Sequence, residues 1–173
     1  MARRSFEPKE YEESVISIDR VTKVVKGGKK MKFRVLVVVG NKKGKVGIGI
    51  GKAIEIPLAI QKGITAAKRN LVTFTLKGTT LPFSTKTRTG AGWVYLQPAV
   101  TGTGIVAGGV VRQIMEKVGV QDVLTKSLGS SNSISLAAAT IDGLRDIEQM
   151  TLMRNLRRQD RINAEPRATE ARQ

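Results

Sequence analysis

The chain has 173 residues, 40% of them hydrophobic and 4% aromatic, which suffices for one compact domain or two small ones with an aliphatic core. Thirty Lys and Arg against 14 Asp and Glu give a formal net charge of +16, so the surface attracts polyanions. Cysteine and histidine are both absent, which excludes disulfides, thiolate or imidazole metal sites, and Ser-His-Asp or Cys-His catalysis. Nucleic acid is the favoured partner, and an anionic membrane surface is the alternative.

No targeting or membrane segment is recognisable. The N-terminal residues lack the apolar stretch of a signal peptide and are too acidic for a typical transit peptide. No apolar run approaches the ~18 residues of a transmembrane helix. We therefore expect a soluble protein that acts where it is made.

The positive charge is concentrated in one stretch of the chain. Residues 1–19 carry three basic and five acidic side chains, whereas residues 20–70 carry fourteen basic side chains and a single acidic one, Glu55. Nearly all of the excess therefore lies within about fifty residues.

This basic stretch alternates with segments typical of β-strands. Residues 15–25 alternate, 35–39 are a run of β-branched and aliphatic residues, and 46–50 form a third candidate strand. The turns between them, 26–30 and 40–45, combine glycine with lysine. Glycine lets backbone N–H groups approach a phosphate and lysine supplies charge, so two basic hairpin loops on a sheet predict a fixed positive surface. A merely solvated charged face is the alternative.

A helix is expected next. Pro57 suits its first turn, and apolar residues recur at helical spacing: Ile60, Ile64, Ala67 and Leu71. Three cations lie off that stripe and can extend the basic face: Lys62, Lys68 and Arg69. A sheet with one helix behind it and basic loops at its edge resembles double-stranded-RNA-binding modules, which recognise A-form shape, phosphates and 2′-hydroxyls.

The second half reads as another α+β unit. An irregular connection over 78–92 leads to a strand over 93–97, whose Trp93 and Tyr95 favour packing over base stacking. A glycine-rich loop over 102–109 precedes a helix that ends at Gly119, a natural C-cap.

A short strand is expected near residues 123–124, followed by a last helix with Asn132 or Ser133 as its N-cap. Its apolar face comprises Ile134, Ala138, Ile141, Leu144 and Ile147. From residue 151 the chain is Arg-rich without a sustained apolar face, and we expect it to be extended and to become ordered on a partner.

Catalytic and nucleotide-binding motifs fail on particular residues. The run over 47–52 would need glycine and Ser or Thr where Val46 and Ala53 stand, so it is not a P-loop. The glycines over 102–108 match a dinucleotide fingerprint only loosely. Asp142 and Asp146 form an i, i+4 pair that we expect to face solvent or a basic partner. We therefore predict no enzyme activity, no cofactor and no metal site.

Several motifs occur in the order typical of one family. They are Asp19-Arg-Val-Thr-Lys-Val-Val-Lys-Gly-Gly-Lys29, Val46-Gly-Ile-Gly-Ile-Gly-Lys-Ala53, Gly102-Thr-Gly-Ile-Val-Ala-Gly-Gly109, Leu128-Gly-Ser130 and Ala139-Thr-Ile-Asp-Gly-Leu144. Over residues 15–147 the chain resembles small-ribosomal-subunit protein five of the bacterial and organellar type. The resemblance implies an α+β fold: a double-stranded-RNA-binding-like module, with a three-stranded antiparallel sheet plus helix, then an α/β module with a left-handed crossover.

The resemblance also implies a domain division and partners. The expected segments are an N-terminal extension (1–14), the RNA-binding-like domain (15–75), the α/β domain (76–150) and the basic tail (151–173). The implied partners are small-subunit ribosomal RNA, the neighbouring proteins four and eight, and messenger RNA at its entry path, with an influence on decoding accuracy. The implied location is the ribosome, in a bacterial cytoplasm or inside a plastid or mitochondrion.

Candidate RNA-binding residues follow from the charge and the resemblance together. They are Arg20, Lys23, Lys26, Gly27, Gly28, Lys29, Lys30, Lys32, Arg34, Lys42, Lys43, Lys45, Lys52, Lys62, Lys68 and Arg69. Gly47, Gly49 and Gly51 would permit close approach or tight packing. By the resemblance, Gly104 and Arg112 would lie toward protein four.

The chain departs from the family's pattern at Phe83, at Ser133, at Ser135 and Ala138, and in the tail. Two rival functions remain open: a double-stranded-RNA-binding protein outside the ribosome, and a small lysine-dependent enzyme or nucleotide binder that uses the glycine loops.

Overall fold

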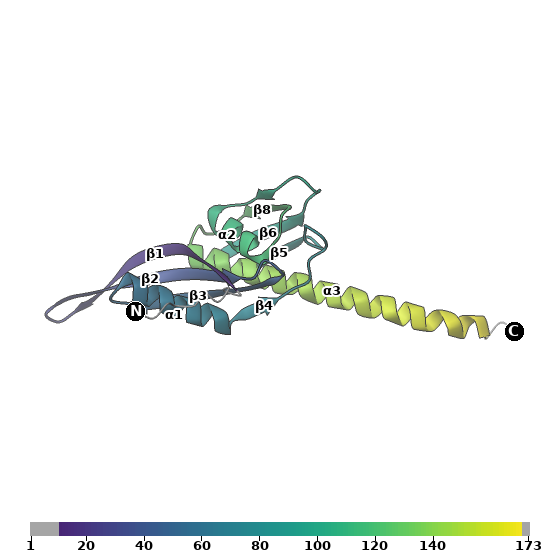
Figure 1. Ribbon diagram of the computed structural model, residues 1–173, viewed down its shortest axis with the longest axis horizontal. Coiled ribbons are helices and arrows are strands. Elements are labelled where there is room, and N and C mark those ends of the chain that lie inside the picture. The colour runs from purple at the N-terminus through teal and green to yellow at the C-terminus, as the bar shows by residue number, and fades with distance from the viewer. Residues whose placement is uncertain (1–10, 171–173) are drawn as a thin grey trace, which may run out of the picture.

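The chain forms two four-stranded sheets with helices packed against them, as the computed structural model shows (Figure 1). This structure describes residues 11–170, with side chains described up to residue 159. Sheet A has the order β1–β2–β3–β4, and its antiparallel strands are β1 (Glu12–Val25), β2 (Gly28–Gly40), β3 (Lys45–Ala53) and β4 (Leu71–Thr73).

The second sheet, sheet B, has the order β5–β6–β8–β7, with β7 and β8 parallel. Its strands are β5 (Thr85–Thr89), β6 (Gly92–Pro98), β7 (Ile105–Val106) and β8 (Val123–Ser127). The helices are α1 (Ile56–Arg69), α2 (Gly109–Val118) and α3 (Ser133–Glu170). These elements confirm the expected α+β class with two successive units. The hand of the β7–α2–β8 crossover stays a prediction.

Strand β2 is buried on both faces over residues 35–39. Val35, Val37 and Val39 belong to an apolar cluster with α1, whereas Leu36 and Val38 belong to a larger cluster with α2 and α3. A strand covered on both sides needs no polar face, so its sequence is a continuous aliphatic run instead of an alternating one. The prediction of a buried strand at 35–39 is confirmed.

Close packing of α1 on sheet A explains the glycines of β3. A Cβ at Gly49 would clash with the backbone of Gly63 and Ala67, and equivalent clashes would arise at Gly47 and Gly51. The helix presents small residues in return, namely Ala59, Gly63 and Ala67. These three β3 glycines are therefore packing residues. The most buried residues of α1 are Ala59, Gly63 and Ala67, whereas Ile60 and Ile64, which periodicity placed on the inward face, are only partly buried.

Some elements differ from expectation. Sheet A has a fourth short strand, β4, and β5 lies within the stretch expected to be irregular. Strand β5 does alternate, but between threonine and basic residues, so its pattern is not apolar–polar. Thr87 donates a hydrogen bond to Asp146 at 2.7 Å and Thr89 donates one to Asp142 at 2.7 Å. The two carboxylates therefore face sheet B, and the expectation that they face solvent or a basic partner is wrong.

The helix ends of the second unit are as expected. Gly119 has a φ of 99° and closes α2, which is a left-handed conformation that favours glycine. Asn132 accepts a hydrogen bond from the backbone N–H of Ile134 at 3.2 Å, so Asn132 caps α3.

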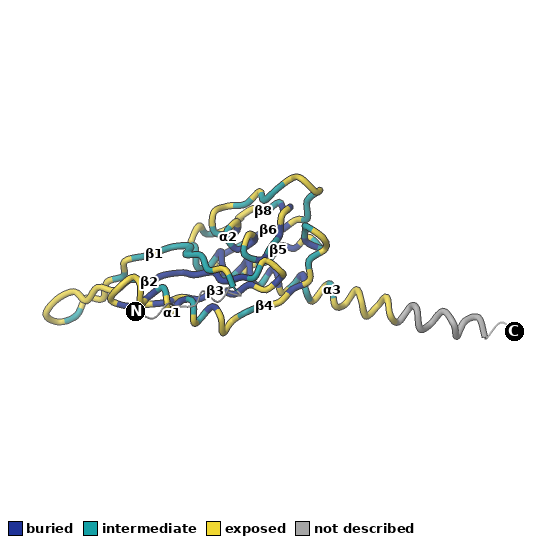
Figure 2. The backbone as a smooth tube through the Cα atoms, viewed as in Figure 1, coloured by how far each residue is buried: buried dark blue, intermediate teal, exposed yellow. Residues whose placement is uncertain are grey.

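The expected extended tail is wrong for residues 151–170, because α3 continues to Glu170. Residues 152–159 are exposed, and this part of the helix projects from the body (Figure 2). Helix nucleation is the unfavourable step, and the buried turns up to residue 147 already provide it. Leu, Met, Arg and Gln have high helix propensities, so the helix extends beyond these turns at little cost in free energy. Residues 171–173 of that tail lie outside the described residues.

Replacing Gly49 with alanine should destabilise the fold, because the added methyl group must displace the backbone of α1. We expect a loss of about 1–3 kcal/mol in the free energy of unfolding, measured by urea denaturation. Gly109→Ala is the matched control, since a Cβ there meets nothing within 4 Å and the residue begins α2, where alanine is a good helix former. Equal stability of the two variants would contradict the packing role of Gly49.

Candidate nucleic-acid interface

The β1–β2 hairpin projects beyond the rest of sheet A and is exposed over its outer half (Figures 1 and 2). Its turn consists of Lys26 and Gly27 alone, because Val25 already pairs with Gly28. Gly27 has a φ of 98° and Gly28 a φ of 151°, both in the region that favours glycine. Lys29 and Lys30 consequently lie on β2 rather than in the turn.

Cross-strand pairing gathers cations on the face of sheet A opposite α1. Lys23 lies opposite Lys30, and Arg34 lies opposite Lys52. Because side chains alternate along a strand, Lys32 shares the face of Lys30 and Arg34. We call this set the hairpin face: Lys23, Lys30, Lys32, Arg34 and Lys52. Further along β2 the same face becomes apolar at Leu36 and Val38, where the second unit covers it.

Most charges on the hairpin face lack a counterion among the side chains that the structure describes. Arg34 donates to Asp19 at 2.9 Å, but within residues 11–159 no carboxylate pairs with Lys23, Lys30, Lys32 or Lys52. Lys23 and Lys30 are direct cross-strand neighbours, and like charges in that position destabilise a sheet. A bound polyanion would relieve this repulsion, which is the electrostatic signature of a phosphate-binding surface.

Other predicted hairpin cations lie elsewhere. Arg20 and Lys29 belong to the opposite face, where Arg20 contacts the Sδ of Met31 at 2.6 Å. Lys26 occupies the exposed turn.

The second lysine-glycine loop, residues 40–45, is docked against α2. Lys42 and Gly44 donate backbone hydrogen bonds to the carbonyls of Lys117 and Val118, both at 2.9 Å. These are carbonyls of the last turn of α2, which lack partners within the helix. Asn41 accepts from the backbone of Lys43 and Lys45 and holds the loop shape. The loop is thus partly structural, although the side chains of Lys43 and Lys45 remain exposed.

Glu12 ties the two units together. Its carboxylate accepts from Lys117 Nζ at 2.8 Å and pairs with Lys42 Nζ at 2.6 Å. The hydrogen bonds from Lys117 and then Lys42 lower the pKa of Glu12 from 4.5 to about 2. Lys42 is therefore already engaged by a carboxylate of its own chain, unlike the lysines of the hairpin face.

The three helix cations do not join the hairpin face. Helix α1 packs on the other side of sheet A, so Lys62, Lys68 and Arg69 lie on a separate surface. Lys68 pairs with Glu13 at 3.0 Å. The expectation that these residues extend one continuous basic face is therefore not met.

Sequence reasoning missed Asp122, which orders the glycine-rich loop before β7. Its buried carboxylate accepts from the backbone N–H groups of Gly102 and Gly104, each at 2.9 Å. The bond from Gly104, with others from Thr79, Gly102 and Thr103, lowers the pKa of Asp122. The loop binds a carboxylate of its own chain in place of a dinucleotide phosphate. Because 18 to 20 residues separate the donors from the acceptor, no local sequence motif indicates this contact.

Gly104 and Arg112 both lie at the β7–α2 end of the second unit. Gly104 has a φ of 75°, and Arg112 is exposed on the first turns of α2 with Glu116 at 3.3 Å. Elsewhere on sheet B, Trp93 and Tyr95 are half-buried, and the Lys86 ammonium lies 4.4 Å from the centroid of the Trp93 ring.

The described residues contain neither a candidate metal site nor a candidate membrane-spanning helix. No group of three or more His, Cys, Asp or Glu side chains there could hold a metal ion. None of the described helices combines the length and apolarity required to cross a bilayer.

Comparison with known proteins agrees with this division into two units. Residues 11–75 match the family model described as Ribosomal protein S5, N-terminal domain, and residues 87–157 match Ribosomal protein S5, C-terminal domain. A small ribosomal subunit protein uS5 from Thermotoga maritima is 51% identical over 144 residues, covering 83% of this chain and 81% of its own. Its counterpart from Pseudothermotoga lettingae is 53% identical over 141 residues, covering 82% and 79%.

These matches place the chain in the class of non-enzymatic structural proteins of ribosomes. More narrowly, the chain belongs to the ribosomal protein S5 family, in its bacterial type.

Replacing Glu12 with glutamine should remove a pH-dependent part of the stability. Because folding lowers the pKa of this carboxylate, its contribution is present above 4.5 and is lost as the pH falls toward about 2. The difference in unfolding free energy between unaltered protein and Glu12→Gln should therefore shrink on acidification from about pH 6 to pH 3. Urea midpoints across that range measure it, and a difference that stays constant would contradict the assignment.

Proposed function

We propose that this protein is a structural constituent of the small ribosomal subunit that binds small-subunit ribosomal RNA through the hairpin face. The observation that carries the proposal is the set of four lysines without carboxylate partners within residues 11–159, with Lys23 and Lys30 opposite one another. Family membership supports the ribosomal assignment.

The chemistry of the face favours recognition of shape and phosphate over base sequence. Ammonium groups act as point charges toward phosphates and do not by themselves read base edges. The face carries no aromatic ring on which an unpaired base could stack, since Phe33 belongs to the opposite side of β2. A rigid two-stranded ribbon of this kind suits the backbone of an A-form helix.

We propose the β7–α2 end, with Gly104 and Arg112, as the surface toward protein four, with protein eight as a further neighbour. The anchoring of the 102–104 loop by Asp122 supports a preformed protein interface there. A place along the messenger-RNA entry path, an influence on decoding accuracy, and the domain division near residue 75 belong to the same proposal. Its support is the family membership.

Cosedimentation distinguishes this proposal from a double-stranded-RNA-binding protein outside the ribosome. The tagged chain should sediment with small subunits through a sucrose gradient in low salt. Recovery at the top of the gradient only, with binding to arbitrary duplex RNA retained, would support the rival function.

Replacing Lys23, Lys30 and Lys32 together with glutamine should weaken binding to purified small-subunit ribosomal RNA. If each lysine contacts one phosphate, the slope of log affinity against log salt should decrease by about 2–3 in magnitude. Filter binding or fluorescence anisotropy across a salt series measures the slope. The same variant should melt no lower than the unaltered protein in low salt, because it also removes the Lys23–Lys30 repulsion.

The matched control removes the same charge from the outer face of sheet B, with Lys86, Arg88 and Lys126 replaced by glutamine. This control should leave most of the salt slope intact. An equal loss in both triple variants would mean that only net charge matters, and would contradict a specific hairpin face.

A further inference from the structure

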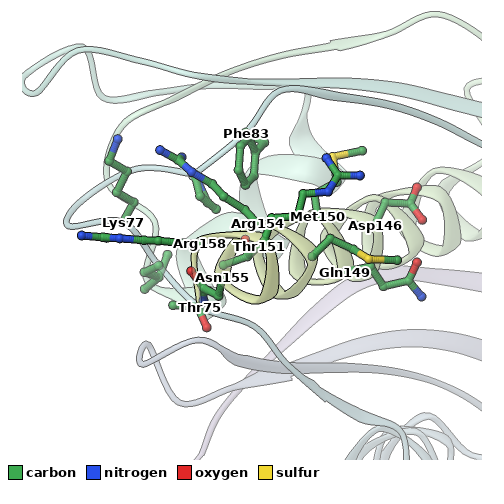
Figure 3. Close-up of a pocket in the computed structure, with 14 residues that line it drawn as sticks. Thr75, Lys77, Phe83, Asp146, Gln149, Met150, Thr151, Arg154, Asn155 and Arg158 are labelled. Atoms are coloured by element: carbon green, nitrogen blue, oxygen red, sulfur yellow. The ribbon is translucent and has the colours of Figure 1, made fainter. Parts of the chain in front are cut away.

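A second basic surface lies where α3 leaves the body. A groove of about 1090 Å³ runs between the first exposed turns of α3 and the connection that follows β4. Its walls carry four cations, Lys77, Arg154, Arg157 and Arg158, together with the ring of Phe83. Figure 3 shows Arg154 and Arg158 on α3, with Phe83 beyond the helix and Lys77 on the neighbouring connection.

The helix places these cations by its own periodicity. Arg154 and Arg158 are four residues apart and Arg157 is three residues from Arg154, so the three guanidinium groups share one face of α3. That face begins next to half-buried Thr151, and Arg154 still contacts Phe83 of the body, so the body end of the groove is fixed by the fold.

The acidic residues nearby are already engaged. Asp146 accepts from Thr87 at 2.7 Å, and Glu148 accepts from the backbone N–H of Thr75 at 2.6 Å. No carboxylate within residues 11–159 forms an ion pair with any of the four groove cations. The groove therefore presents four positive charges that lack carboxylate partners among the described side chains.

The aromatic ring distinguishes this surface from the hairpin face. The guanidinium of Arg154 lies 5.5 Å from the centroid of the Phe83 ring, within the range of a cation–π contact. An aromatic ring and a planar guanidinium are the groups on which an unstacked base packs in single-stranded RNA recognition. The hairpin face has charge alone, whereas the groove combines charge with a stacking platform.

We propose that this groove binds a single-stranded segment of small-subunit RNA, with phosphates on Lys77, Arg157 and Arg158 and one base against Phe83 and Arg154. This inference rests on the proposed ribosomal-RNA function and adds a second, chemically different RNA site. An acidic segment of a neighbouring protein would satisfy the cations, but it would leave the aromatic–guanidinium platform unused.

The test uses the full chain and purified small-subunit ribosomal RNA, with hydroxyl-radical footprinting and a salt series. Replacing Arg154, Arg157 and Arg158 with glutamine should remove one discrete region of protection that the hairpin variant keeps. The salt slope should decrease by about 1.4 in magnitude, because the variant removes two phosphate contacts, Arg157 and Arg158, and each contact on a single strand contributes about 0.7. Circular dichroism should show an unchanged helix content, because glutamine and arginine have similar helix propensities.

Phe83→Leu separates stacking from charge. It keeps an apolar side chain and removes the ring, so we expect binding to weaken on the order of tenfold, the loss of roughly one stacked base. The salt slope should not change, and the nucleotide that loses protection should lie within the region lost by the arginine variant. The sheet B triple variant with Lys86, Arg88 and Lys126 replaced is the charge-matched control and should retain that region.

The outcomes distinguish the two proposals. If the unaltered chain does not bind the RNA, both the proposed function and this site are overturned. If it binds, and the arginine variant keeps every protected region and the full salt slope, only the groove proposal is overturned. Loss of a crosslink to a neighbouring protein in reconstituted subunits, with RNA protections unchanged, would also overturn it and assign the groove to a protein partner.

Discussion

The burial of β2 on both faces is the constraint on which the rest of the structure depends. One side of residues 35–39 packs against α1 and the other side packs against α2 and α3. A single strand therefore belongs to the cores of both units, and neither core is complete without it. The glycines of β3 follow from the same constraint, because α1 can cover β2 only if it lies close to the neighbouring strand.

The cations of β2 lie where the strand is no longer covered by the second unit. The even-numbered side chains of β2 are cationic from Lys30 to Arg34 and become apolar at Leu36, where the second unit begins to cover the sheet. Where the chain needs its cations for internal contacts, carboxylates lie opposite them, as Glu12 lies between Lys42 and Lys117. Apart from Arg34, the cations of the hairpin face and those of the α3 groove have no such partners among the described residues, so the charge there costs stability that a bound polyanion can restore.

Sequence patterns predicted correctly the elements that depend on interactions between residues close together in the chain. The aliphatic run at 35–39, the glycine that ends α2 and the asparagine that caps α3 each reveal their structure within a few residues. Strand β5 escaped prediction because its inward face is threonine bound to helix carboxylates, which matches neither the apolar alternation of a strand nor the composition of a loop.

Long-range contacts explain the remaining differences. Nothing near Lys42 indicates that Glu12 engages it, and nothing near Gly104 indicates Asp122, because each pair is distant in the sequence. The charge of residues 20–70 was correctly located, but its division between the hairpin face and the α1 side depends on strand register. The helical tail was missed because its helicity derives from the buried turns before it.

The shared strand also has a consequence for synthesis of the chain. Leu36 and Val46 are synthesised roughly 70 residues before Ile114 and the other residues that cover them. Translation adds about 5–20 residues per second, so the aliphatic face of the nascent sheet stays uncovered for several seconds. Such a face invites nascent chains to associate. The same half-protein carries most of the net positive charge, and mutual repulsion opposes association of its copies until the second half is synthesised.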